Sequence, residues 1–311
     1  MEEKDTSCYK AGDAGVIFEV LRDGVPVAFS GPKTEGRLSR RYESHREEKI
    51  SGQLGWNYHC DLNASNDWMT GGGDGFSSCR VVNGPEVYVP RPVEKLVRGK
   101  LLEGRPVQQG ILPTFPARPV AEAMQKTPLA FRFPEELTGK TVPEFPFVFR
   151  ATEGEGLWFI LDLGEESVGW LSFDLTVPDG GAVWVRYGEH LADGRCRTGR
   201  RNYTFDFTAA PGRNRFLGPF RRLACRYLQF YVESREVTVH SAGIIPTDYP
   251  LRIIPFNCGN LLRQTIDQVC LRTLQLCMHE HYEDCRSREQ ALYILDCRNE
   301  MLCGYYAFVE Y

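Results

Sequence analysis

The sequence predicts a mainly β protein, in which an N-terminal β-rich domain and an antiparallel β-sandwich are followed by helices. Strand-like segments separated by tight turns recur between residues 157 and 245, prolines crowd residues 113–146, and the apolar spacing becomes helical after Pro250. We therefore expect a β-rich domain over residues 1–112, a connection and the start of the sandwich over 113–150, the sandwich over 151–249, and a helical region over 250–311.

The N-terminal region contains short apolar alternations at residues 16–20 and 87–89, broken by many turn residues. Segments 63–67 and 71–75 are rich in Asn, Asp and Gly and are predicted to be loops. The second segment lacks the Lys-Ser/Thr ending of a phosphate-binding loop, which argues against a nucleotide site.

The connection contains prolines at positions 113, 116, 119, 128, 134, 143 and 146. Proline lacks a backbone donor, so this density predicts an extended connection without a regular helix or a central strand.

The clearest strands are predicted at residues 157–161, 168–177, 182–187, 203–207 and 226–232. A Pro-Asp-Gly-Gly turn begins at Pro178, and an Asp193-Gly194 turn follows the third of these strands. Strands at this spacing favour an antiparallel sandwich, which we expect to close near Ile245.

Two helices are predicted after Pro250. The first is expected to begin at Asn257 or Asn260, either of which could cap it, and to end near Met278; the second runs from Arg288 to Tyr311. Because the final segment is too apolar for a solvated terminus, we expect it to need partner helices and interpret the chain as a truncated one.

Composition excludes several functions. The net charge is −4 and the basic residues are scattered, so neither nucleic acid nor a membrane is an expected partner. The N-terminus lacks the apolar segment of a secretory signal, and the 11 cysteines form no C-x-x-C pair, which predicts a cytoplasmic protein with reduced thiols. The local excess of arginine at 195, 197, 200 and 201 favours an exposed loop over an anion site.

The candidate chemistry lies between the two predicted helices. Asp284 is expected just before the second helix and Glu289 in its first turn, with Asp296 two turns later on the same face. Crowded carboxylates can keep a proton on one member for glycoside hydrolysis, while others accept hydrogen bonds from sugar hydroxyls. The alternative is structural: Asp284 caps the helix, Glu289 complements its dipole and Asp296 forms surface pairs. Spacing alone favours this alternative.

Other candidates have structural explanations. His279 and His281 lack a nearby third ligand, so no metal or cofactor is expected. Strand tryptophans are expected in the core, and only Trp56 and Trp68, in loop-like surroundings, are candidates for carbohydrate contact.

Residues 279–311 resemble the first active-site segment of glycoside hydrolase family 78, the α-L-rhamnosidases, which opens with an Asp-Cys-Pro-x-Arg-Glu motif. Upstream, the segments Asp162-Leu-Gly-x4-Gly-Trp-Leu, Tyr187-Gly-Glu-His-Leu-x-Asp-Gly and Gly218-Pro-Phe-Arg-Arg-x3-Arg-Tyr are similar to that family's sandwich. Tyr88-Val-Pro-Arg-Pro resembles its N-terminal β domain more loosely. The resemblance implies a jelly-roll, concanavalin-like sandwich followed by the first helices of an (α/α)6 barrel.

The family's activity is inverting hydrolysis of terminal α-L-rhamnosides, so a rhamnose-containing oligosaccharide or glycoside is the implied partner. The resemblance assigns the general acid to Glu289. It assigns sugar binding to four further residues: Asp284, Arg288, Tyr293 and Asp296.

Three departures accompany the resemblance. Arg286 stands where the family has proline, Leu295 where many members have glycine, and the general base is expected beyond Tyr311. The 311 residues alone are therefore expected to be inactive. The alternative from another class is a non-catalytic carbohydrate-binding or structural β protein. The sequence indicates no oligomeric state.

Overall fold

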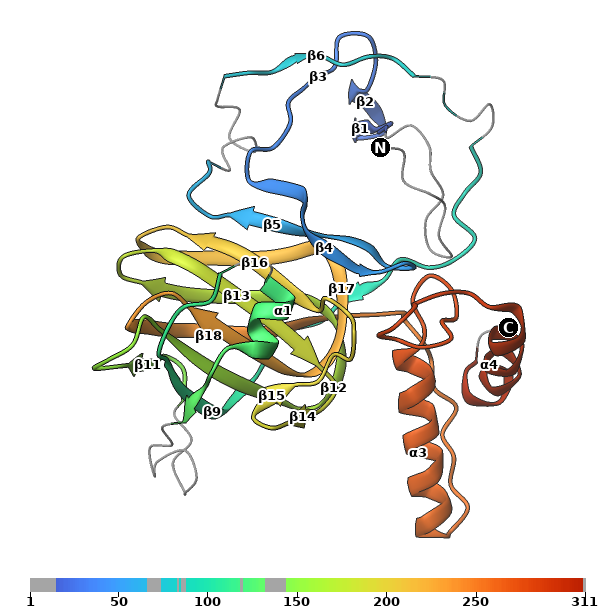
Figure 1. Cartoon of the computed structure of the whole chain (residues 1–311). Helices are drawn as coiled ribbons and strands as arrows, with labels where there is room; N and C mark the ends of the chain where they lie inside the picture. Colours follow the sequence, from blue (N-terminus) through green and yellow to red (C-terminus); the bar gives the residue numbers. More distant parts are fainter. Residues whose placement is uncertain are drawn as a thin grey trace.

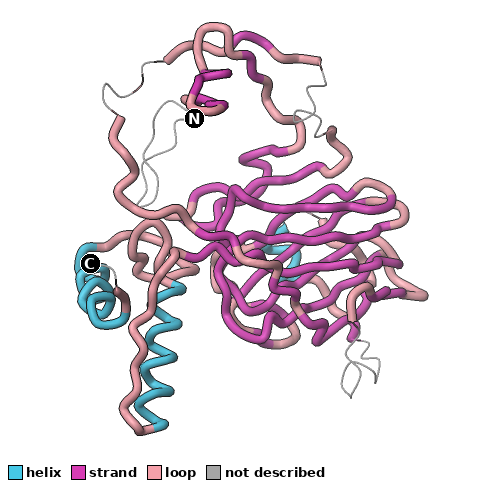
Figure 2. Tube along the Cα trace, turned by 180° about the vertical axis from the view of Figure 1, so that it is seen from behind, coloured by secondary structure: helices cyan, strands magenta, loops and turns pink. Residues whose placement is uncertain are grey.

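The computed structural model describes residues 15–65, 74–82, 84, 88–117, 120–131 and 144–309. Strands dominate it, as predicted. Figure 1 shows a β-rich body with the C-terminal helical segment beside it, and Figure 2 shows the same arrangement from behind. None of the helices in these residues is long and apolar enough to cross a membrane.

The main body is a 12-stranded sheet folded into a sandwich. Its strands along the main path are β10 (Ala130–Phe131), β9 (Arg105–Leu112), β12 (Gly156–Val177), β17 (Gly212–Val232), β13 (Gly181–Gly188), β16 (Thr204–Ala209), β5 (Gly55–Asp61) and β4 (Tyr42–Ser51). β18 (Glu236–Asp248) pairs with β12 and also with β7 (Val97–Arg98), β8 (Leu102–Glu103) and β11 (Phe147–Arg150). The pairs are antiparallel except β16 with β5.

The smaller sheets are two-stranded. They pair β1 (Glu19–Arg22) with β2 (Val25–Phe29), β3 (Glu35–Gly36) with β6 (Ser77–Ser78), and β14 (Leu191–Ala192) with β15 (Arg195–Cys196). The β14–β15 turn has positive φ at Asp193 (53°) and Gly194 (68°), the conformation expected of a tight Asp-Gly hairpin. The predicted turn is thus confirmed.

β12 joins two of the predicted strands into one. It pairs with β17 along most of its length, with a register shift between Asp162 and Ser167. This irregularity bends the strand and directs Glu165 and Glu166 out of the ladder toward the helical region.

The core lies between the folded halves of this sheet. Phe159 and Phe230 stack in parallel with ring centroids 4.7 Å apart, and both side chains are fully buried. Each such burial contributes about 1.5–3 kcal/mol to folding. Of the strand tryptophans expected in the core, Trp158 and Trp184 are buried, whereas Trp170 is half-buried.

Gly169 allows β18 to approach β12. A Cβ at this position would lie 2.1 Å from the carbonyl oxygen of Ile245, a backbone atom that cannot rotate away. Only glycine fits this pairing.

The connection contains one element that the proline pattern did not predict. Helix α1 (Val120–Lys126) covers a second apolar cluster, to which it contributes Val120 and Met124. The prediction of a helix-free stretch was wrong, because the sequence Val-Ala-Glu-Ala-Met-Gln-Lys lies between Pro119 and Pro128 and proline is tolerated where a helix begins.

The first predicted C-terminal helix is confirmed as α3 (Leu261–Leu276). Asn260 is its N-cap, and the Asn260 side chain accepts a hydrogen bond from the Arg263 amide at 3.1 Å. The second helix, α4, spans Ile294–Ala307 and so begins six residues later than predicted.

Strands β4, β5 and β9 pair with the strands of residues 156–232 in one sheet. The predicted domain divisions stay predictions.

All cysteines within the described residues are free thiols, half of them buried.

Candidate active-site loop and adjoining pocket

Residues 279–291 form a loop between α3 and α4, closed by Asp284. The Asp284 amide donates to the Ala291 carbonyl at 2.9 Å, and the Asp284 carboxylate accepts from the Ala291 amide at 3.0 Å. Gln290, with φ of +52°, reverses the chain, and its side chain donates to the Arg286 carbonyl at 2.7 Å. Arg288 and Glu289 therefore lie on a turn just before this reversal.

The predicted placement of Glu289 in the first helical turn was wrong. Because the left-handed conformation at Gln290 and the two Asp284–Ala291 bonds interrupt the chain, helix α4 begins only at Ile294. Glu289 and Asp296 consequently do not share a helical face. Asp284 closes the loop rather than capping the helix.

Asp296 lies in the first turn of α4, with Glu300 one turn later. Burial, together with repulsion from Asp296 and Asp284, raises the pKa of Glu300 to about 7. Its Oε2 atom is buried and has no hydrogen-bond partner in the described part of the chain. The structure thus brings Asp284, Asp296 and Glu300 together, and a proton can reside on Glu300 at neutral pH.

Sequence reasoning missed Glu300. The i, i+4 spacing from Asp296 was the available signal, but it acquires meaning only because Asp284 approaches from the preceding loop.

The loop is anchored to the sandwich by a buried ion pair. Arg222 of β17 donates from Nη1 to both carboxylate oxygens of Glu283 at 2.9 and 2.7 Å, and their side chains are 7% and 2% exposed. Arg222 also donates to the Met278 carbonyl at 3.1 Å. Burial raises the pKa of Glu283 more than the Arg222 guanidinium lowers it, so the carboxylate depends on this partner to remain ionised.

A second anchor involves Arg286. Its guanidinium pairs with Glu166, in the irregular part of β12, and lies 3.8 Å from Glu189. The Ser287 hydroxyl donates to Glu189 at 3.0 Å, and the Tyr203 hydroxyl donates to the Ser287 carbonyl at 2.8 Å. Arg286 therefore ties the loop to the sandwich.

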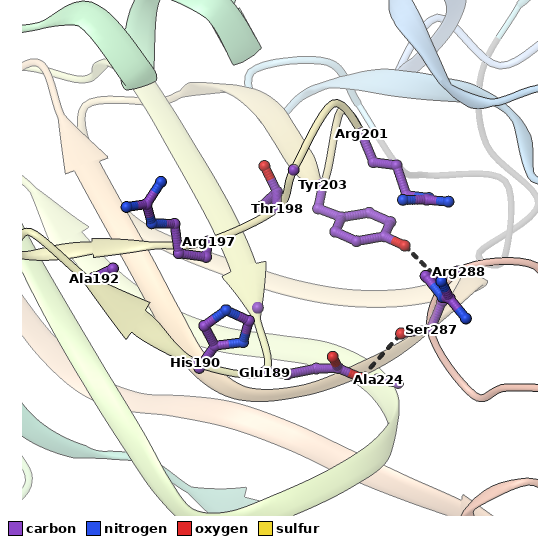
Figure 3. A pocket seen from close by; sticks show the side chains of 12 residues that line it. Glu189, His190, Ala192, Arg197, Thr198, Arg201, Tyr203, Ala224, Ser287 and Arg288 are labelled. Atoms are coloured by element: carbon purple, nitrogen blue, oxygen red, sulfur yellow. Dashed lines mark hydrogen bonds between the residues drawn. The ribbon is translucent and has the colours of Figure 1, made fainter.

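A pocket of about 440 Å³ adjoins the loop on the sandwich side. Its charged and polar lining includes Glu189, His190, Arg197, Arg201, Tyr203 and Arg288. Figure 3 shows the Tyr203 ring pointing at the turn that carries Ser287 and Arg288, with Arg201 reaching toward the same turn.

The arginine-rich loop is only partly the exposed segment that was predicted. Arg195 donates to the Met124 and Thr127 carbonyls and holds α1, whereas Arg197 and Arg201 line the pocket. Arg200 is exposed.

Tyr293 and Trp56 lie outside the pocket lining, as do Asp284, Glu289 and Asp296. Tyr293 precedes α4 as its N-cap residue, without a side-chain capping bond, and is 37% exposed. The prediction of loop-like surroundings for Trp56 was wrong, because Trp56 lies in strand β5, where its indole packs against His45 and Lys49. Trp68 lies outside the described residues.

The rings of the two loop histidines, His279 and His281, have centroids 6.5 Å apart. Burial and the nearby Arg222 guanidinium lower the pKa of His279 to about 4, and its Nδ1 atom lies 3.8 Å from the Glu283 carboxylate. Within the ranges described, no three His, Cys, Asp or Glu side chains converge as metal ligands do.

Comparison with known protein families shows what the sandwich is similar to. Residues 153–242 match the model of the bacterial alpha-L-rhamnosidase concanavalin-like domain. The resemblance to bacterial α-L-rhamnosidases is confirmed. The rhamnosidase-like domain includes Glu166, Glu189 and Arg222, the residues that anchor the loop.

Solved rhamnosidases are similar over parts of the chain. The family 78 rhamnosidase of Bacillus sp. GL1 is 31% identical over 54% of this chain and 18% of its own, with a TM-score of 0.49. The Streptomyces avermitilis α-L-rhamnosidase, solved with L-rhamnose, is 15% identical over 86% of this chain and 22% of its own, with a TM-score of 0.51. The chain therefore spans about a fifth of the length of these enzymes. A comparison with curated protein sequences gave no match.

Proposed function

We propose that these residues belong to an inverting glycoside hydrolase that removes terminal α-L-rhamnosyl units, with Glu289 as the general acid. The carrying observation is the match of residues 153–242 to the rhamnosidase sandwich, followed by the Asp284-Cys-Arg-Ser-Arg-Glu segment on a loop anchored to that sandwich. The rhamnose-bound state of the Streptomyces enzyme supports rhamnose as the sugar.

In the proposed mechanism, Glu289 donates its proton to the glycosidic oxygen as the bond to the anomeric carbon breaks. A second carboxylate, roughly 6.5–9.5 Å from the acid, removes a proton from the water that attacks the opposite face of the sugar. We propose that this base lies downstream of residue 311, in the remainder of an (α/α)6 barrel. The 311 residues alone are then expected to be inactive.

The other loop residues are proposed to hold the substrate. Asp284 and Asp296 accept hydrogen bonds from sugar hydroxyls, Arg288 donates to ring substituents, and Tyr293 packs against the sugar face. Anchoring by Arg222 and Arg286 supports these roles, because catalytic groups require a fixed position relative to the reacting bond.

We further propose a cytoplasmic location.

The test is hydrolysis of p-nitrophenyl α-L-rhamnoside by the longest gene product containing these residues. We expect release of p-nitrophenol, with β-L-rhamnose as the first anomer seen by proton NMR. Glu289→Gln should lower turnover, and by less on this activated substrate than on an alkyl rhamnoside. Glu280→Gln is the matched control. Glu280 lies on the same loop as Glu289, pairs with Arg91 and is 46% exposed. Full activity in Glu289→Gln would exclude Glu289 as the acid, and α-L-rhamnose as the first product would exclude inversion.

The alternative, a non-catalytic carbohydrate-binding protein, is favoured by the pocket, which is lined mostly by residues 188–224 of the sandwich. Sugar binding without hydrolysis by that same long gene product would support it.

A further inference from the structure

The pocket beside the loop has an excess of positive charge. Its lining contains the guanidinium groups of Arg197, Arg201 and Arg288 and the carboxylate of Glu189. Arg197 is already paired with Asp193 at 3.0 Å. The two other guanidinium groups are those of Arg201 and Arg288, and Arg288 also lies near the Glu289 and Asp284 carboxylates.

Arg201 and Arg288 line the pocket from two loops, one between β15 and β16 and the other between α3 and α4. Burial raises the pKa of the Tyr203 hydroxyl, while Arg201 and Arg288 both lower it, so both guanidinium groups lie within electrostatic range of the same oxygen. Figure 3 shows Arg201 on one side of this hydroxyl and the Arg288 turn on the other. The structure therefore presents two cations from separate elements to one region.

Arg201 is held in this position with donor capacity unused. Its amide donates to the Thr198 carbonyl at 3.1 Å, closing a turn that contains Gly199 with φ of +59°. The Nε atom of Arg201 is buried and has no hydrogen-bond partner among the residues that the structure describes. Because this buried Nε is closed to the pocket, an anionic oxygen of a ligand would have to be bound by the terminal Nη donors of Arg201.

The rest of the lining suits a hydroxylated ligand. Thr198, His190 and Glu189 add hydroxyl, imidazole and carboxylate groups, which can donate to and accept from sugar hydroxyls. Glu189 would repel a phosphate dianion, whereas it can accept a hydrogen bond from the hydroxyl of a monoanionic sugar. A volume of about 440 Å³ also exceeds what a bare anion fills.

We propose that this pocket binds a carboxylate-bearing sugar, with the uronate carboxylate between Arg201 and Arg288 and the sugar hydroxyls near Glu189 and Thr198. The inference rests on the proposed function in one respect: it makes the preferred rhamnoside one that carries a uronic acid unit near the cleaved bond. Binding itself does not depend on hydrolysis.

The test is calorimetric titration of the 311-residue protein with methyl β-D-glucuronide, and separately with methyl β-D-glucoside and inorganic phosphate. We expect binding of the uronide, with the neutral glucoside at least about tenfold weaker, since a charge-assisted hydrogen bond contributes about 1.5–3 kcal/mol. Equal binding of both sugars, tighter binding of phosphate, or no binding of any probe would each overturn the proposal.

Variants locate the site. Arg201→Ala should weaken uronide binding by about tenfold or more, and Arg288→Ala should act similarly without touching the core, because Arg288 is exposed. Arg200→Ala is the matched control from the same loop, exposed and outside the pocket lining. Circular dichroism checks folding. If Arg200→Ala weakens binding as much as Arg201→Ala, the site is not this pocket. Because hydrolysis is not measured, these outcomes are independent of whether Glu289 is the general acid.

Discussion

Replacing Arg222 by methionine should destabilise the protein by about 3–5 kcal/mol. The Arg222–Glu283 pair is almost fully buried, with side chains 7% and 2% exposed. Removal of the arginine leaves a buried carboxylate without its cation, and breaking such a pair costs about 3–5 kcal/mol. Methionine approximates the apolar part of arginine, so the loss reports mainly on charge.

The assay is urea unfolding followed by tryptophan fluorescence at pH 7.5. The double variant Arg222→Met/Glu283→Met removes both charges and should recover most of the loss, because a buried ion pair and an apolar pair of similar volume are often close in stability. The matched surface control is Arg150→Met, whose Glu236 partner is 40% exposed; it should change stability far less than Arg222→Met, because water screens an exposed pair. A loss below about 1 kcal/mol for Arg222→Met, or no recovery in the double variant, would show that this pair does not anchor the loop.

Three further predictions concern the helical region. Glu300 has a pKa raised from 4.5 to about 7 in the folded protein, so its contribution to stability is present below about pH 4.5 and lost as the pH rises through 7. Glu300→Gln should therefore raise stability at pH 8 by about 1 kcal/mol, after allowance for solvent screening, and by nothing at pH 4; an equal change at both pH values would contradict this. Asn260→Ala removes the cap of α3 and should cost about 1 kcal/mol of helix stability, whereas Asn257→Ala should cost less; helicity followed by circular dichroism separates them. Arg286→Ala should speed hydrogen exchange at the Gln290 and Ala291 amides, measured by mass spectrometry, and unchanged exchange would mean that the Glu166 contact does not order the loop.

Local patterns predicted the sandwich and α3 well. The turn at Asp193-Gly194, the β12 and β13 strands and the Asn260 cap depend on neighbouring residues alone, so they can be read from the chain. The short helix α1 was obscured by flanking prolines, although its own residues are good helix formers.

The candidate site was predicted less completely. Asp284 and Asp296 both lie near the Glu300 carboxylate, in agreement with the expectation that these two residues belong to one region. Glu289, however, is on a turn rather than a helix. Continuous helical spacing cannot reveal that the Asp284 carboxylate bonds to Ala291 and that Gln290 adopts positive φ. Nor can it reveal the anchors from Arg222 and Glu166, because they lie more than sixty residues away in sequence and depend on tertiary contact.

The most direct test of the account compares two substrates of different leaving-group quality with the Glu289→Ala variant of the long gene product. A general acid protonates a poor leaving group, whereas 2,4-dinitrophenolate departs without protonation. The account predicts that hydrolysis of methyl α-L-rhamnoside falls by about 10²–10⁴-fold, while hydrolysis of 2,4-dinitrophenyl α-L-rhamnoside stays near that of the unaltered enzyme. An equal loss on both substrates would contradict the assignment of Glu289 as the acid.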